Sequence, residues 1–154
     1  MGYHHHALSG RITVYLVDKR GHRVDQVDQS NEIVNDGRML IGQLLTGDTL
    51  ATPISHLAVG TGQTPPAPTD AALEMESASI DRSPISVTPL TDPNSIGLRV
   101  SAQVSSATNQ AISEAGLFNA SEHNTGTIYN RVVFPSPLPI GTDLDLVIEW
   151  DITF

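Results

Sequence analysis

Two groups of residues in this sequence are of types that can bind a phosphate or a metal ion. Gly60, Thr61 and Gly62 match part of a phosphate-binding glycine loop, in which backbone N–H groups surround the phosphate. The third glycine or the lysine of such loops is missing, and prolines follow where a helix should begin. We therefore interpret this GTG sequence as a turn.

The acidic residues Asp143, Asp145 and Glu149 form the second group, because Ca²⁺ prefers carboxylate oxygens as ligands. A calcium-binding loop also needs a curled backbone and a glycine at its sixth position, which here is Ile148. Polar and apolar residues alternate through this segment, as they do in an extended strand. The alternation favours a solvated acidic face over a metal site.

The chain has no common catalytic motif, since HExxH and GxSxG are both absent. His56 lies in an expected strand without a nearby acidic residue, which favours a hydrogen-bonded structural histidine over a general base. His4, His5 and His6 are either a remnant of an affinity tag or a native arm, with a three-histidine metal site as the minor alternative. We predict no enzyme activity and no catalytic, cofactor-binding or metal-binding residue; a triad assembled from distant positions stays open.

The composition restricts the chain to a narrow set of protein classes. Of its 154 residues, 39% are hydrophobic and 16% are charged, which is typical of an all-β domain rich in turns. The formal net charge of −9 disfavours binding to nucleic acid. The absence of cysteine excludes disulfides and thiolate metal sites. No segment has the length and apolarity of a signal peptide or a membrane span, so we expect a soluble, unexported protein without membrane contact.

Segments rich in β-branched and aromatic residues predict a series of strands separated by polar turns. The expected strands are residues 11–18, 23–29, 54–59, 79–90, 98–105, 111–118, 127–134 and 143–154. The first two should form one hairpin, and the strands 111–118 and 127–134 should form another. Residues 135–141 contain three prolines and predict a connection between strands.

One helix is expected after the first hairpin. Asn35 or Asp36 can cap its start, and Gly47 stands where a C-terminal cap belongs. A helix this short is marginal alone, so its apolar stripe should pack on a sheet. The stripe consists of Met39, Leu40, Ile41, Leu44 and Leu45.

These elements predict a mainly β protein: an antiparallel β-sandwich or flattened barrel with one short covering helix. No repeat or compositional break divides the sequence, which indicates a single β-rich domain over residues 1–154, with residues 1–9 as a flexible N-terminal arm. The alternation of the final segment predicts a half-buried strand. We expect Trp150, Ile152 and Phe154 near its end to need cover from a neighbouring subunit.

Three sequence segments follow one another in a distinctive order. They are ISHLAVGTGQTPPAPTDAALEMES, ISEAGLFNASEHNTGTIYNRVVFPSPLPI and LDLVIEWDITF. This order resembles that of small tail, tail-fibre and fibre-attachment proteins of tailed bacteriophages and of related contractile injection particles. One difference is the stretch ESASIDRSP, which is shorter than the charged or arginine-rich stretch that the family often carries there.

The resemblance implies a non-enzymatic structural component of a tailed-phage virion, placed in the tail, baseplate, neck or at a fibre-attachment position. Such a protein is made in the bacterial host cytoplasm and acts through protein–protein assembly with other virion proteins. A homo-oligomer is expected, either a trimer or a hexamer around the tail axis. The alternative is a receptor- or glycan-binding β-sandwich module of a tail fibre, whose site usually displays exposed aromatic residues.

The hairpin of residues 111–118 and 127–134 predicts a charged pair. If Phe118 pairs with Thr127, Glu114 and Arg131 lie directly opposite each other and form a cross-strand ion pair. A slip of one residue would instead place them on opposite faces of the sheet.

The loop of residues 60–70 is the expected contact with a neighbouring subunit. Proline fixes the backbone, so a loop stiffened in this way loses little entropy when it docks. A plain solvent-exposed connector is the alternative. The interface residues expected here are Pro65, Pro66 and Pro68.

Overall fold

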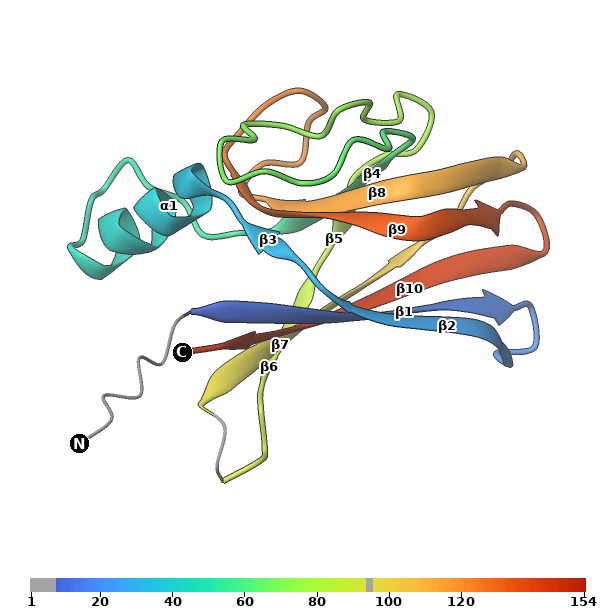
Figure 1. Ribbon diagram of the computed structural model, residues 1–154, viewed down its shortest axis with the longest axis horizontal. Helices are drawn as coiled ribbons and strands as arrows, with labels where there is room; N and C mark the ends of the chain where they lie inside the picture. Colours follow the sequence, from blue (N-terminus) through green and yellow to red (C-terminus); the bar gives the residue numbers. More distant parts are fainter. Residues whose placement is uncertain (1–7, 94–95) are drawn as a thin grey trace.

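The computed structural model describes residues 8–93 and 96–154, and contains two antiparallel sheets and one short helix, α1, Asn35–Leu45 (Figure 1). Sheet A has the strand order β2-β1-β10-β7-β6, and sheet B has the order β3-β9-β8-β4-β5. This architecture confirms the predicted mainly β sandwich. His4, His5 and His6 lie outside the described residues. The strands are β1 Ser9–Asp18, β2 Arg23–Ser30, β3 Glu32–Ile33, β4 His56–Gly60, β5 Ser83–Pro84, β6 Ser86–Pro89, β7 Gly97–Val104, β8 Gln110–Phe118, β9 Ile128–Ile140 and β10 Leu144–Thr153.

Sheet A is built around β10, which lies between β1 and β7. Its alternate residues Leu146, Ile148, Trp150 and Ile152 are buried, as the alternation predicts. They belong to the same hydrophobic core as residues of sheet B such as Leu117. The hydrophobic effect therefore holds the two sheets face to face.

Two segments differ from their predicted structure. The prolines of residues 135–141 predict a connection, but β9 continues through them to Ile140. β3 is only two residues long and pairs with β9 near Arg131, so the far half of β9 has an open edge, where residues without an N–H donor are tolerated. The predicted strand 79–90 is interrupted, because β5 belongs to sheet B and β6 to sheet A. The chain crosses between the sheets there.

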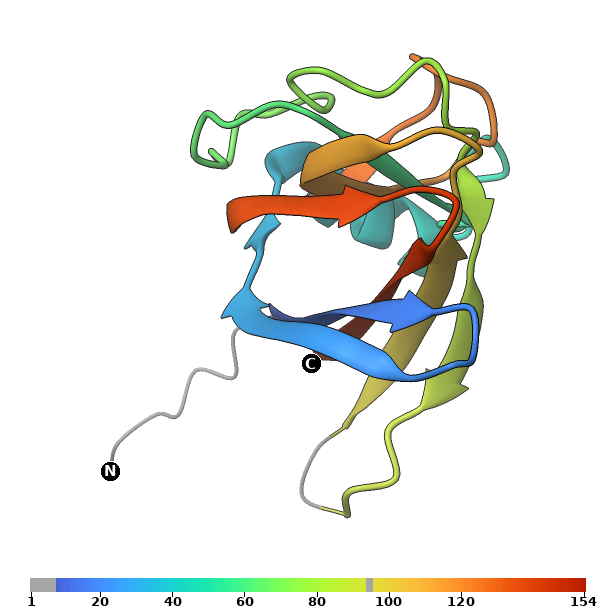
Figure 2. The same ribbon diagram turned by 90° about the vertical axis from the view of Figure 1, so that its right-hand side faces the viewer.

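Sheet B is covered on both faces. One face packs on sheet A, and the segments 61–82 and 119–127 lie over the other (Figures 1 and 2). Every residue of β8 from 112 to 118 is consequently buried. A second, smaller core lies beneath the covering segments and consists of Val34, Ala58, Leu73, Phe118 and Ile128.

The helix α1 lies at one end of the sandwich, beside β9 (Figure 1). Its N-cap residue is Val34, and the expected caps Asn35 and Asp36 lie inside its first turn, so this detail of the prediction is wrong. Gly47 follows the helix with a φ of 74°, which confirms its role in ending the helix. No helix in residues 8–93 and 96–154 has the length and apolarity needed to cross a membrane.

The apolar stripe of α1 is only partly covered. Gly37 brings the helix against β9, since a Cβ at this position would lie 2.1 Å from the carbonyl oxygen of Tyr129. Leu40 is buried, but Met39 and Leu45 are exposed. The prediction that the whole stripe packs on a sheet is therefore wrong, because only one side of the helix meets β9.

Candidate functional site

The chain forms a closed loop after β4, and this loop covers the outer face of sheet B. Residues 61–75, which we call the GTG loop, leave β4 at Gly60 and return at Glu76, which forms a bridge with Gly60. The N–H of Thr61 donates to the carbonyl of Met75 at 2.9 Å. The two ends of the loop are thus fastened to each other, as in a compact Ω-loop.

Glu114 on β8 holds the GTG loop from below with a fully buried carboxylate. Its Oε1 accepts hydrogen bonds from the N–H groups of Gly62 (3.0 Å) and Met75 (2.7 Å). Its Oε2 accepts from the N–H of Glu74 (3.1 Å) and from Nε of Arg131 (2.8 Å). These donors fill the roughly four acceptor positions of a carboxylate. Glu114 therefore has no lone pair left for general-base catalysis or for a metal ion.

The close approach of the loop to this carboxylate explains both glycines of the GTG sequence. A Cβ at Gly62 would lie 2.5 Å from Oε1 of Glu114, and a Cβ at Gly60 would lie 2.3 Å from the carbonyl oxygen of Met75. Contacts this short exclude any side chain. The glycines serve the packing of the loop on Glu114, in agreement with the interpretation of this sequence as a turn.

Arg131 on β9 supplies the positive charge beneath the loop. Its Nε donates to Glu114, and its Nη1 donates to Oδ2 of Asp70 at 2.9 Å. Its Nη2 lies 3.6 Å from Oε2 of Glu74. Burial alone would lower the pKa of the Arg131 guanidinium, but the hydrogen bonds to Asp70 and Glu114 raise it above its ordinary value. The charged arginine thus ties β9 to Glu114 on β8 and to two points of the GTG loop.

The predicted ion pair of Glu114 and Arg131 is present, but the predicted strand register is wrong. Glu114 lies opposite Val133, and Arg131 lies opposite Gly116. A shift of two residues keeps both side chains on the same face of the sheet, so they meet diagonally. The pair is also buried beneath the loop, whereas a simple hairpin would leave it exposed.

The GTG loop presents its prolines to solvent while a second carboxylate holds its outer part. Glu74 accepts hydrogen bonds from the N–H (2.8 Å) and the hydroxyl (2.7 Å) of Thr64, and both bonds lower the pKa of Glu74 below its ordinary value. Pro65 and Pro68 are exposed, and Pro66 is half-buried. The three expected contact residues therefore lie on a surface that is fixed from inside.

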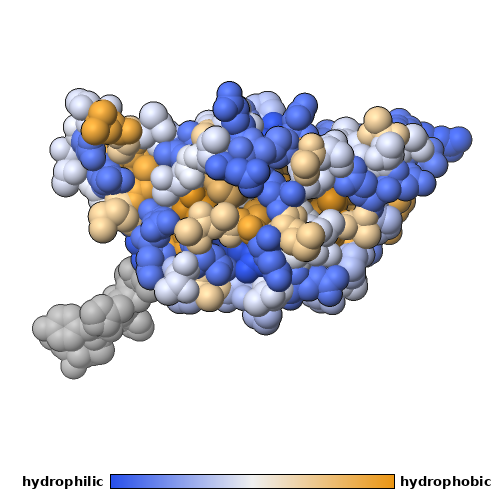
Figure 3. Space-filling model, turned by 90° about the horizontal axis from the view of Figure 1, so that it is seen from above, coloured by the Kyte–Doolittle hydropathy of each residue, from blue (hydrophilic) through white to orange (hydrophobic). Residues whose placement is uncertain are grey.

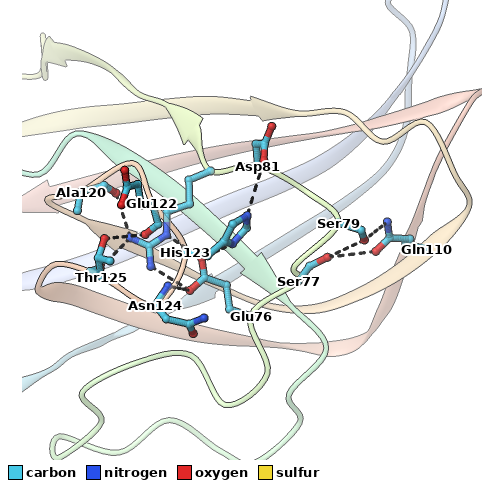
Figure 4. Close-up of polar contacts among 11 residues, drawn as sticks. Glu76, Ser77, Ser79, Asp81, Gln110, Ala120, Glu122, His123, Asn124 and Thr125 are labelled. Carbon is cyan, nitrogen blue, oxygen red and sulfur yellow. Dashed lines mark hydrogen bonds and ion pairs between the residues drawn. The ribbon is translucent and has the colours of Figure 1, made fainter.

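A second buried charge pair fixes the loop between β8 and β9 (Figure 4). Arg82 donates from Nε and Nη2 to the two carboxylate oxygens of Glu76, at 2.7 and 2.9 Å. Its Nη1 donates to the carbonyl oxygens of Ala120 and Thr125, each at 3.0 Å. The guanidinium also lies 3.9 Å from the ring centroid of Phe118. One arginine thus connects the end of the GTG loop to the neighbouring loop.

Glu76 accepts further hydrogen bonds from that neighbouring loop. Nδ1 of His123 lies 3.1 Å from its Oε1, and the N–H of Asn124 donates to its Oε2 at 3.3 Å (Figure 4). Burial alone would raise the pKa of Glu76, but the hydrogen bonds from Arg82 and Asn124 lower it below its ordinary value. Nε2 of His123 lies 3.7 Å from Asp81. The polar turn predicted around His123 is therefore anchored by carboxylates.

No protein-family model matches this chain. Comparisons with curated proteins and with solved structures also find no match.

The C-terminal residues that are expected to need a partner are mostly covered by the chain itself. Trp150 is 1% exposed and Ile152 is 4% exposed, both within the core between the sheets. β10 is central in sheet A, so its inward face meets sheet B. The prediction of Trp150 and Ile152 as interface residues is therefore wrong, and Phe154 alone of the three is exposed.

The candidate metal-binding and catalytic residues of the sequence make local contacts in the structure. No cluster of three or more His, Asp or Glu side chains in residues 8–93 and 96–154 is placed to hold a metal. His56 has its Nδ1 2.8 Å from the hydroxyl of the adjacent Ser55. Asp145 lies 3.5 Å from Nζ of Lys19. What the two loop-holding clusters can do chemically is to fix loop positions.

Several charged residues of these clusters have no predicted role in the sequence. They lie in the segment 61–82, which is otherwise rich in proline, alanine, serine and threonine. Carboxylates in such a segment are the available signal, since a covering loop needs acceptors for its buried N–H groups. The residues are Asp70, Glu74, Glu76 and Arg82.

The outer face of sheet A contains a concavity of about 860 Å³ that is lined mainly by residues with hydroxyl groups or charged side chains. On its floor, Arg99 donates from Nε and Nη2 to the carboxylate of Asp151, at 2.7 and 2.8 Å. None of the described residues that line it is aromatic. Hydroxyl groups come from Ser9, Ser30, Thr88, Thr91 and Thr153.

Proposed function

We propose that this chain is a non-enzymatic structural component of a tailed-phage virion that acts through protein–protein assembly. The observation that carries the proposal is the GTG loop, which displays prolines above the buried Glu114–Arg131 pair. A loop that is already ordered loses little conformational entropy when it binds a partner. This preorganisation suits a lasting contact with other virion proteins.

The order of the sequence motifs supports the same proposal. The motifs that resemble those of tail proteins are the GTG sequence, the EAGLF strand and the later arginine. In the structure they converge, because Gly62 donates to Glu114 and Arg131 pairs with Glu114. The motif order thus has a physical reason, which is to hold one loop in place.

The saturation of the buried carboxylate supports a role without catalysis. Glu114 is surrounded by donors that are already bonded to it. A general base needs a free lone pair directed at its substrate. The hydrogen bonds to Glu114 instead connect the strand to the loop, and polar networks of this kind fix one conformation.

Incorporation into particles tests the proposal. In a host that makes both this chain and phage particles, we expect mass spectrometry of the purified particles to detect the chain. The double variant Pro65→Glu, Pro68→Glu should fold but be depleted from particles at least about tenfold, since a desolvated charge opposes docking. Arg20→Glu in the exposed β1–β2 turn is the matched control. Purified particles without the intact chain would contradict the virion assignment, and normal incorporation of the proline variant would contradict the contact role of the loop.

The second candidate function is a receptor- or glycan-binding module of a tail fibre. The concavity on sheet A favours it, because hydroxyl groups and the Arg99–Asp151 pair can form hydrogen bonds with sugar hydroxyls. The lack of an aromatic stacking surface among its described lining residues ranks it second. Glycan-array binding that is lost in Arg99→Ala would favour this candidate over the first.

A further inference from the structure

The helix α1 and the turn after it carry a concentration of exposed apolar side chains. Leu45 is 83% exposed and Leu50 is 89% exposed, while Met39 is 65% exposed. Figure 3 shows hydrophobic residues reaching the surface at the end of the molecule where α1 lies. Exposed apolar patches of this kind mark interaction surfaces.

Gly42 lies on the same exposed side of α1 and has no reason within the chain to be glycine. Nothing lies within 4 Å of a Cβ built on Gly42, whereas Gly37 is in close contact with β9. Glycine inside a helix is less stable than alanine. Met39, Gly42 and Leu45 follow at three-residue spacing and share one side of the helix. This side therefore offers a notch between two apolar side chains, where a second helix can approach closely.

Charged residues lie at both ends of this surface and not between them. Residues 39–47 are uncharged, with Arg38 before them and Asp48 after them. The Arg38 guanidinium has no carboxylate partner in the described part of the chain. Asp48 accepts a hydrogen bond from the N–H of Leu50 and has no cationic partner there. With a net charge of −9, two copies repel each other over much of their surface, but not over this one.

We propose that two copies of this chain associate through α1 about a two-fold axis, with the helices antiparallel and crossing near Gly42. A two-fold contact places the same surface on both sides. Arg38 of each copy then faces Asp48 of the other, because the two residues lie at opposite ends of the surface. The contact covers Met39, Leu45 and Leu50 of both copies.

The symmetry of this contact restricts the oligomer. A two-fold contact produces a dimer, or a hexamer made of three pairs, whereas a cyclic trimer contains no two-fold contact. Of the two oligomers implied by the tail-protein resemblance, the hexamer is the one that can include it. The contact itself does not depend on the position of the protein in a particle.

Sedimentation equilibrium of the full chain over a wide concentration range tests the contact. We expect an even-numbered oligomer whose dissociation constant rises at least about tenfold in Leu45→Glu, because a charge must then be buried at the centre of the contact. The matched control is Val24→Glu, which changes an exposed apolar residue on β2. The control should associate like the unchanged chain, and circular dichroism should show that both variants are folded.

Charge reversal tests the two-fold arrangement. Arg38→Asp alone brings two acidic residues together, and Asp48→Arg alone brings two arginines together, so each should weaken association. The double variant Arg38→Asp, Asp48→Arg should restore association, because the exchanged charges attract again. A double variant as weak as the single ones would overturn the antiparallel arrangement.

Three results would overturn the contact as a whole: a monomer at every concentration, an odd-numbered oligomer, or association that Leu45→Glu leaves unchanged. A chain that is monomeric alone but enters phage particles would overturn the α1 contact and leave the proposed function standing. A chain that dimerises through α1 but is absent from particles would do the reverse.

Discussion

Two arginine–carboxylate pairs with nearly equal Nε-to-oxygen distances lie on the two outer faces of the sandwich. Nε of Arg131 is 2.8 Å from Glu114 beneath the GTG loop, and Nε of Arg99 is 2.7 Å from Asp151 on the bare face of sheet A. The side chain of Arg131 is 3% exposed, and that of Arg99 is 46% exposed. The two pairs therefore differ in burial and not in distance.

Burial changes what each pair does for the fold. An exposed pair is screened by water and salt and contributes about 0–1 kcal/mol. In a buried pair each partner depends on the other, because an uncompensated charge in the interior is strongly unfavourable. The charges on sheet B therefore determine where a loop lies, whereas those on sheet A keep a surface hydrated.

The largest expected effect is that of Glu114→Ala. The substitution leaves Arg131 with one fewer anion and removes the acceptor of the N–H groups of Gly62, Glu74 and Met75. We expect the free energy of unfolding, measured in urea, to fall by about 3–5 kcal/mol. Glu114→Gln, which keeps one carbonyl acceptor, should lose less. A loss below about 1 kcal/mol, as expected for an exposed pair, would show that burial does not give the Glu114–Arg131 pair a larger contribution to stability than the Arg99–Asp151 pair.

Arg82→Met should have the next largest effect. It keeps an apolar side chain beside Phe118 but removes the bonds to Glu76 and to the loop between β8 and β9. We expect a loss of about 2–3 kcal/mol and faster protease cleavage in that loop than in the GTG loop. Arg20→Met in an exposed turn is the control. Equal cleavage of both loops would argue against a separate role for Arg82.

A smaller effect should follow from acid. The pKa values of Glu74 and Glu76 in the folded protein lie below the ordinary value of 4.5. Their contribution to stability is therefore full above pH 4.5 and is lost as the pH falls through the lowered values. Urea unfolding at a series of pH values should show decreasing stability below pH 4.5, with a shallower decrease in Glu76→Gln. If stability falls with pH as steeply in Glu76→Gln as in the unchanged chain, the Glu76 carboxylate does not contribute to the acid sensitivity.

Arg99→Ala should have the smallest effect. The exposed pair with Asp151 should contribute about 0–1 kcal/mol, and the difference from the unchanged chain should shrink at high salt. Urea unfolding at low and high ionic strength measures both quantities. A loss of stability similar to that of Glu114→Ala would show that the exposed pair on sheet A contributes as much as the buried pair on sheet B.

The sequence predicts best those strands that have one buried and one solvated face. β10 follows this rule, and its buried residues are the predicted ones. β8 lacks a solvated face because the GTG loop covers it, so its pattern gives little information on register. The Glu114–Arg131 pair is nevertheless predictable, since a register shift of two residues preserves the face.

The rest of the site is difficult to predict because its partners lie in loops. Arg82 meets Glu76 and the carbonyl of Ala120, and no periodicity relates these positions. The continuation of β9 through Pro135, Pro137 and Pro139 depends on how short β3 is, which local sequence does not reveal. Likewise, the exposed side of α1 follows from the approach of Gly37 to β9.

The position of β10 also sets the order in which the protein can fold during synthesis. β1 pairs with β10 along its whole length, from Ser9 opposite Thr153 to Asp18 opposite Leu144, and the first of these pairs spans 144 positions of the chain. Until the ribosome has made β10, the apolar side of β1 has no central strand to join. Pairings this distant in sequence form slowly and leave apolar strands open to aggregation. Sheet A is therefore the part of this molecule that is most open to aggregation while the chain is being made.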